Sequence, residues 1–285
     1  MSGTTRLPSP PGRSRHVADA NAAAFFDLDR TLISNSSAIY FGIAAWRNKM
    51  IPTSELLSDA ANAVTFKLVG ATDERSEAVR ERILHAVEGA EQSELLALNE
   101  DIVPRILERV RPESRGLIDM HHEAGRETWI VSASPVELVE PLAKALGMTG
   151  AIATVSEVVD GRYTGRLEGP FVYGEGKAEA IEKLAGERGY DLRLSYSYSD
   201  SASDLPMMEM VGHPVAVNPD RPLENVAHQR GWPIVTFSRR TKQVVKMTTA
   251  ATGGVALAAA TYLLGRRHGR IAAEASRGRA LKPWR

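Results

Sequence analysis

Short continuous runs of apolar residues recur along the chain, separated by longer stretches with helical spacing. The first run, residues 22–26, leads into the polar sequence Asp27-Leu-Asp29. A continuous apolar run of this length is typical of a strand that is buried on both faces of a parallel sheet. Because such runs alternate with helical stretches, we expect an α/β fold with a doubly wound parallel sheet. Residues 127–131 and 194–198 predict two further strands, and two late apolar runs, 214–217 and 233–237, predict the last ones.

Residues 38–115 follow a different pattern. Their apolar positions have helical spacing, Gly70 and Gly89 interrupt them, and no strand-like run occurs among them. We therefore expect an all-helical cap domain inserted into the α/β core, with residues 21–37 and 116–238 forming that core.

Turn signals locate a hairpin and the core helices. Asp160-Gly161 separates two runs with strand character, residues 155–159 and 163–167, which predicts a β-hairpin. Helical spacing predicts core helices near 114–124 and 135–146, each followed by a glycine, and a further helix that begins near Lys177.

Charge and composition narrow the function classes. The 285 residues include 35 basic and 35 acidic side chains, so no global field favours nucleic acid as a partner. There is no cysteine, which excludes disulfides and cysteine-ligated metals. Residues 1–20 are rich in Pro, Ser, Gly and Arg and lack the apolar run of a secretory signal, so we expect a disordered leader.

Polar side chains with chemical potential follow the predicted strands or begin helices. Because residues just past the carboxyl ends of neighbouring parallel strands converge on one crevice, we expect these side chains to form one site. They are Asp27, Asp29, Ser132, Lys177, Asp200 and Asp204.

This set of side chains fits phosphoryl transfer from a monoester. Asp27 is placed to attack phosphorus as a covalent nucleophile, and Asp29 to protonate the leaving oxygen and then deprotonate water. Several carboxylates near a dianionic phosphate call for a hard cation, and carboxylate oxygens suit Mg²⁺. The Lys177 ammonium and the Ser132 hydroxyl would orient the remaining phosphate oxygens.

These segments resemble, in order and spacing, the four motifs of the haloacid dehalogenase superfamily. They are Asp27-Leu-Asp29-Arg-Thr31, Val131-Ser132, Lys177 and Ser199-Asp200-Ser-Ala-Ser-Asp204. The helical insert resembles the cap of the subfamily that contains phosphoserine phosphatase. The resemblance implies a Mg²⁺-dependent phosphatase in which Asp27 is the nucleophile and Asp29 the general acid and base. It further implies phosphate binding by Ser132, Lys177 and Thr31, and Mg²⁺ binding by Asp27, the Asp29 carbonyl and Asp200, with Asp204 supporting the metal.

The substrate is less determined than the chemistry. Phosphoserine phosphatases carry a glutamate nine residues after the nucleophile, where this chain has Ser36, and a neutral hydroxyl supplies no charge for a substrate ammonium. The sequences Val131-Ser-Ala-Ser-Pro135 and Tyr196-Ser-Tyr-Ser-Asp200 resemble a branch of the subfamily with links to phospholipid metabolism. We therefore expect a small-metabolite or lipid phosphomonoester, with phosphoserine as the alternative.

The C-terminal segment, residues 239–285, is basic and carries an apolar stretch. Residues 247–265 are nineteen in a row without charge, just enough to span a bilayer, but they are mainly Ala, Thr and Gly. Membrane contact through this stretch, at the inner face of the plasma membrane of a cytoplasmic protein, is one interpretation; a helix docked on the core is the other.

Two rival functions remain open at this stage. One is a membrane-tethered regulatory protein that binds a phosphorylated ligand with little turnover, against which stands the complete acid set including Asp29. The other is a phosphotransferase or mutase that uses the same aspartyl-phosphate.

Overall fold

The computed structural model describes residues 21–48, 81, 84 and 87–237. Its centre is a six-stranded sheet in the order β3-β2-β1-β6-β7-β8, in which every neighbouring pair is parallel. These strands are β1 Ala23–Asp27, β2 Glu127–Pro135, β3 Gly150–Thr154, β6 Tyr196–Ser199, β7 His213–Val217 and β8 Ile234–Val235. A separate antiparallel hairpin consists of β4 Ser156–Val159 and β5 Arg162–Leu167. The predicted parallel sheet and hairpin are both confirmed.

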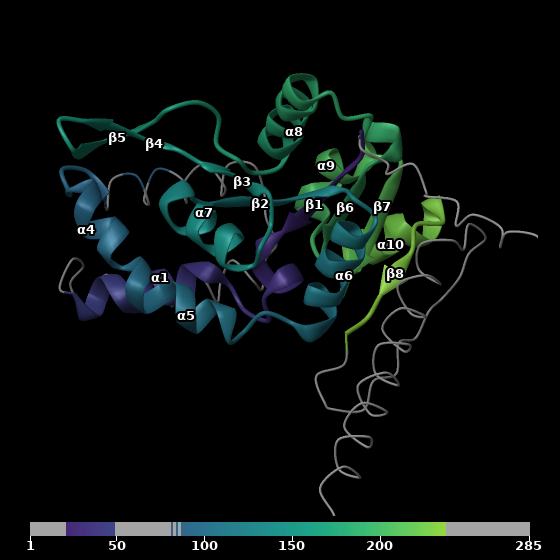
Figure 1. The fold of residues 1–285 in the computed structure, drawn as a ribbon, viewed down its shortest axis with the longest axis horizontal. Coiled ribbons are helices and arrows are strands. Elements are labelled where there is room, and N and C mark those ends of the chain that lie inside the picture. The colour runs from purple at the N-terminus through teal and green to yellow at the C-terminus, as the bar shows by residue number, and fades with distance from the viewer. Residues whose placement is uncertain (1–20, 49–80, 82–83, 85–86, 238–285) are drawn as a thin grey trace, which may run out of the picture.

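Helices cover both faces of the sheet (Figure 1). Those of the described residues are α1 Ser37–Arg47, α4 Gln92–Ala97, α5 Asn99–Leu107, α6 Pro112–Glu123, α7 Val136–Ala145, α8 Glu175–Arg188, α9 Leu205–Glu209 and α10 Arg221–Arg230. The side chains of α5, α6 and α7 share one apolar cluster with one face of the sheet, and those of α8, α9 and α10 share a second cluster with the other face.

Strand β1 shows why the apolar run is continuous. Ala24 and Phe26 belong to the first cluster, whereas Ala23 and Phe25 belong to the second, and all four side chains are buried. Successive side chains of a strand point to opposite faces, so these four positions, covered on both sides, are all apolar. The sequence pattern at β1 thus follows directly from the two helical layers.

Strand ends differ from the predicted ones where side chains take over backbone hydrogen bonds. Leu194, predicted to begin a strand, instead ends the 3₁₀ turn Leu192–Leu194, in which the Asp191 carboxylate accepts from the Arg193 N–H. Strand β8 is short because, past Val235, the Asn218 side-chain oxygen accepts from the Phe237 N–H and ends the ladder.

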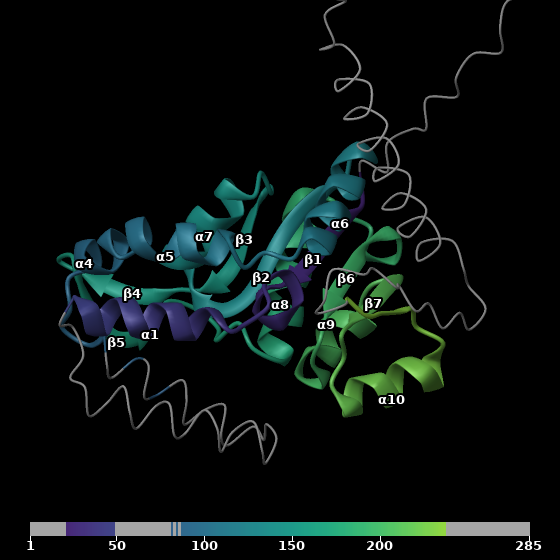
Figure 2. The same cartoon turned by 90° about the horizontal axis from the view of Figure 1, so that it is seen from below.

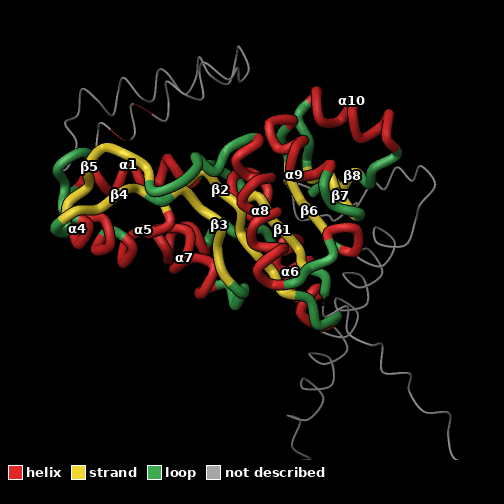
Figure 3. Tube along the Cα trace, turned by 90° about the horizontal axis from the view of Figure 1, so that it is seen from above, coloured by secondary structure: helices red, strands yellow, loops and turns green. Residues whose placement is uncertain are grey.

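The insert and the hairpin extend together to one side of the sheet (Figures 2 and 3). Backbone hydrogen bonds join them: the Gly89 N–H donates to the Tyr163 carbonyl, and the Tyr163 N–H donates to the Ala90 carbonyl. In the described part of the insert, Glu91 forms an isolated β-bridge with Arg162, and Val110 forms one with Ile33. The helical pattern of the insert does not indicate these bridges.

The leader and the apolar tail stretch lie outside the described residues. Predictions for residues 1–20 and 247–265 therefore have no structural counterpart. Within the described ranges, no helix combines the length and apolarity that a bilayer crossing requires.

Candidate active site

A buried lysine joins two of the predicted acidic residues. Lys177 lies in the first turn of α8, and its Nζ is 2.7 Å from Asp27 Oδ1 and 2.9 Å from Asp204 Oδ2. The Ser199 hydroxyl donates to Asp204 at 2.7 Å. Burial acts to lower the pKa of Lys177, but Asp204 and Asp27 raise it by more, so the net pKa lies above its usual value and the ammonium stays charged.

The carboxylates of the site carry more negative charge than this lysine neutralises. Burial raises the pKa of Asp27 to about 8; Lys177 opposes that rise, while Asp204, Asp200 and Asp29 add to it. Burial likewise raises the pKa of Asp200 to about 7, against the opposing effect of Arg30. A further cation beside Asp27 and Asp200 would relieve this repulsion.

The turn after β1 places Arg30 against Asp200. Arg30 has a positive φ of 61°, and its Nε lies 2.9 Å from Asp200 Oδ2. A positive φ is unusual for a non-glycine residue and costs free energy. The sequence did not single out Arg30, since an arginine beside acidic residues is usually a solvated charge.

Asp29 is held by the start of the insert. Its Oδ2 accepts a hydrogen bond from the Ser36 hydroxyl, and its Oδ1 accepts from the Ser37 N–H, each at 2.7 Å. The Ser37 hydroxyl lies 2.8 Å from that of Ser134, which lies near the end of β2, two residues beyond Ser132. Asp29 is therefore oriented by the beginning of α1, and the beginning of α1 is in turn fixed to the end of β2, where Ser132 lies.

The predicted phosphate ligands lie at the same sheet edge. Asp27 pairs in register with Val131, so Ser132 is one residue beyond it, is 4% exposed and accepts from the Ser134 N–H. The Thr31 Oγ1 is buried, and no protein hydrogen-bond partner is present for it in the described chain. An unpaired buried hydroxyl is available to a ligand oxygen.

A residue that the sequence did not indicate holds the loop between Asp200 and Asp204. Asp220 caps α10 by accepting from the Leu223 N–H, and its other oxygen accepts from the Ala202 N–H at 3.2 Å. The Asp220 carboxylate, at the N-terminus of α10, thus supports the loop between Asp200 and Asp204. The only sequence signal was its helix-cap position, which predicts a structural role.

The site suits a magnesium ion by its donor types. Carboxylate oxygens of Asp27 and Asp200 are hard ligands of the kind that Mg²⁺ prefers. Among the described residues, no three His, Asp or Glu side chains gather as a metal-binding group.

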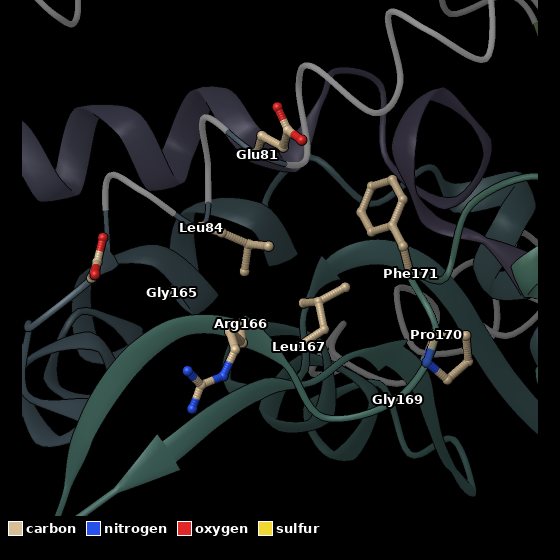
Figure 4. A pocket seen from close by; sticks show the side chains of 9 residues that line it. Glu81, Leu84, Gly165, Arg166, Leu167, Gly169, Pro170 and Phe171 are labelled. Carbon is tan, nitrogen blue, oxygen red and sulfur yellow. The ribbon is translucent and has the colours of Figure 1, made fainter.

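A cavity lies apart from these side chains. It has a volume of about 480 Å³ and lies between Glu81, Leu84 and Glu88 of the insert and the end of β5 with the residues that follow it (Figure 4). Its lining residues are Glu81, Leu84, Glu88, Gly165, Arg166, Leu167, Gly169, Pro170 and Phe171. None of them is a predicted site residue, so we assign no catalytic role to this cavity.

Comparison with known proteins decides the family. The model of the haloacid dehalogenase-like hydrolases matches residues 24–209, which include every predicted site residue. The chain belongs to this family. The resemblance seen in the motifs is thereby confirmed.

Two relatives of this haloacid dehalogenase-like hydrolase are phosphatases by name. Phosphoserine phosphatase SerB1 of Mycobacterium tuberculosis is 40% identical over 255 residues, covering 88% of this chain and 83% of that protein. Histidinol-phosphatase of Neisseria meningitidis is 33% identical over 224 residues, covering 75% and 98%. A crystal structure of a Bordetella pertussis protein of unknown function is 30% identical, with a TM-score of 0.67 and coverage of 75% and 97%. The chain is a phosphatase of the haloacid dehalogenase-like hydrolases.

Proposed function

We propose that this phosphatase hydrolyses a small phosphomonoester through an aspartyl-phosphate on Asp27, with Mg²⁺ as cofactor. The observation that carries the proposal is the buried contact of Lys177 with both Asp27 and Asp204, at the edge of the sheet where Asp29 and Ser132 also lie. A buried ammonium between carboxylates is costly to assemble for stability alone, and it suits the binding of a dianion next to a nucleophile.

The cofactor proposal rests on the donor set. Asp27, Asp200 and the backbone carbonyl of Asp29 would hold Mg²⁺, and Asp204 would support this set by anchoring Lys177. Bound there, the ion would neutralise the phosphate and let it approach the carboxylates.

Each chemical step has a residue of this chain to perform it. Asp27 attacks phosphorus, the bond to the leaving oxygen breaks, and Asp29 donates a proton to that oxygen. Ser132, Thr31 and Lys177 bind the phosphoryl oxygens. Asp29 then accepts a proton from the water that attacks the aspartyl-phosphate, which releases phosphate and restores Asp27.

For the organic group of the substrate, our proposal is narrower than the range of substrates in the names of the relatives. Two relatives are named for different substrates, phosphoserine and histidinol phosphate, so similarity leaves the leaving group open. Ser36 donates to Asp29 and places a neutral group beside the acid. This favours a leaving group without an ammonium at that position. Phosphoserine is the second candidate, which the 40% identical relative supports.

The test is phosphate release, with and without Mg²⁺, from phosphoserine, histidinol phosphate, glycerol phosphate and lysophosphatidate. We expect release that requires Mg²⁺ and is lost in Asp27→Asn, with glycerol phosphate preferred to phosphoserine. Preference for lysophosphatidate would instead support a lipid substrate. Undiminished release by Asp27→Asn would rule out the covalent mechanism.

Binding of a phosphorylated ligand without its hydrolysis would favour the regulatory alternative. Asp29→Asn separates the two, because only hydrolysis needs a proton donor at this position. Transfer of phosphate to added glycerol in preference to water would support a phosphotransferase.

A further inference from the structure

One buried carboxylate outside the site joins the core to both the insert and the hairpin. Glu137 lies in the first turn of α7 and is 8% exposed. Its Oε1 accepts from the Tyr163 hydroxyl at 2.9 Å and from Gln92 Nε2 at 3.2 Å. Its backbone carbonyl accepts from Asn99 Nδ2 at 2.6 Å. A single core residue thus contacts β5, α4 and α5.

The three partners of Glu137 belong to one connected unit. In addition to the bonds around Tyr163 given above, the Gln92 N–H donates to the Gly161 carbonyl at 2.9 Å. Arg162 pairs with Glu91 beside them. The hairpin follows Ser132 in the sequence, yet its backbone is bonded to the insert that precedes Ser132. The hairpin and the described end of the insert are therefore expected to shift together.

Stability alone does not explain an acid at position 137. Its Oε2 is buried and lacks a hydrogen-bond partner among the described residues. A buried carboxylate that receives hydrogen bonds only from neutral groups is costly, and apolar side chains of similar volume are often more stable at such positions. What the carboxylate provides is a fixed direction for two donors from two different elements.

The position of Glu137 connects this unit to the catalytic residues. Helix α7 follows directly from the end of β2, so Glu137 is five residues from Ser132 and three from Ser134. The Ser134 hydroxyl contacts Ser37, whose N–H holds Asp29. A change in how the insert meets α7 would therefore reach the proton donor, Asp29, through Ser134 and Ser37.

We infer that Glu137 is a positioning residue that sets the insert and hairpin relative to Ser132 and Asp29, and thereby controls how the leaving group is held. The inference rests on the proposed hydrolysis. It assigns leaving-group positioning to the contact of Glu137 with Tyr163 and Gln92, and phosphate binding to the core.

The experiment compares Glu137→Leu, Glu137→Gln and Tyr163→Phe, with p-nitrophenyl phosphate as substrate and inorganic phosphate as competitive inhibitor. Tyr190→Phe is the matched control, because its hydroxyl contacts only core groups, Trp129 and Glu127. Wild-type turnover that is lost in Asp27→Asn is required first; its absence would overturn the proposed hydrolysis, and the inference with it.

We expect Glu137→Leu to lower kcat/KM by about tenfold. Both kcat and KM should change, because Glu137 positions the insert and hairpin and does not itself contact the phosphate. The inhibition constant of phosphate should stay within about twofold, because phosphate contacts the core. Glu137→Gln keeps an acceptor of the same shape and should recover most of the activity.

Tyr163→Phe should shift the constants in the direction of Glu137→Leu, whereas Tyr190→Phe should leave them unchanged. This second variant decides the question should Glu137→Leu fail to fold. Wild-type constants in Tyr163→Phe, or an equal loss of phosphate binding and turnover in the folded Glu137 variants, would overturn the inference while leaving the hydrolysis intact.

Discussion

The core and the insert hold their charges in different ways. At the sheet edge, Lys177, Asp27 and Asp204 are almost wholly buried, and each side chain touches another. Between the insert and hairpin, Arg162 and Glu91 form an ion pair whose side chains are 57% and 47% exposed. Water screens the exposed pair of Arg162 and Glu91. The buried charges of Lys177, Asp27 and Asp204 need all their partners, because an unpaired charge in the core costs much more free energy.

The difference explains why the chemistry of this chain is easier to infer than its substrate. A buried charged group constrains its neighbours strictly, so the residues that move phosphate must occur in a fixed arrangement. Exposed contacts contribute little energy and can be exchanged, so the insert and hairpin, which we propose hold the leaving group, can vary between relatives. The two different substrates in the names of its relatives agree with this view.

The largest expected effect concerns the buried lysine. Lys177→Met removes the cation and leaves Asp27 and Asp204 without it, which should lower the free energy of unfolding by about 3–5 kcal/mol. Arg193→Met is the control, since it removes a cation from an exposed pair with Asp191. Urea unfolding measures both. Equal small effects would contradict the contrast between buried and exposed charge.

The next effect tests a buried histidine of the core. Arg126 donates to Nδ1 of His121, so the neutral ring carries its proton on Nε2, which lies 2.8 Å from the Tyr198 hydroxyl. Burial, with Arg126 and His122 adding to its effect, lowers the pKa of His121 from 6.5 to about 3.

The sign of the pH effect follows from this lowered pKa. Above pH 6.5 the ring is neutral in both states; below it, the unfolded chain binds a proton that the folded protein does not. The free energy of unfolding should fall by up to about 1.4 kcal/mol per pH unit between about pH 6.5 and 3. His121→Asn should reduce this slope in chemical denaturation, and the exposed His228→Asn should not. An unchanged slope in His121→Asn would show that the ring is protonated in the fold.

A smaller effect is expected where the insert meets the acid. Ser36→Ala removes one of the two hydrogen bonds to Asp29 and should lower kcat about tenfold, a part of what a general acid contributes. Ser36→Thr keeps the hydroxyl and serves as the matched variant. Steady-state hydrolysis of p-nitrophenyl phosphate measures both, and full activity in Ser36→Ala would mean that the Ser37 N–H suffices.

The smallest effect belongs to the exposed pair of the insert. Arg162→Ala should change the free energy of unfolding by less than about 1 kcal/mol, since solvent screens both partners. Thermal or urea unfolding in low and high salt checks this. A loss as large as that of Lys177→Met would show that the junction with the hairpin is as strict as the core.

The sequence by itself determined the parallel sheet, the hairpin and the residues that carry the motifs. Strand β1 is apolar from Ala23 to Phe26 because helices cover both of its faces, and a turn such as Asp160-Gly161 depends on local backbone geometry. Both signals are local, so they can be read from neighbouring residues.

Only the tertiary structure decided which distant residues support the site. Ser37 and Ser134 are 97 positions apart. Tyr163 contacts Glu137 from a hairpin whose backbone is hydrogen-bonded to the insert. No local sequence pattern predicts the contact of Arg30 with Asp200, or that of Asp220 with the loop between Asp200 and Asp204. Hydrogen bonds between such groups depend on positions in space, which the packing of whole elements determines, so spacing along the chain does not predict them.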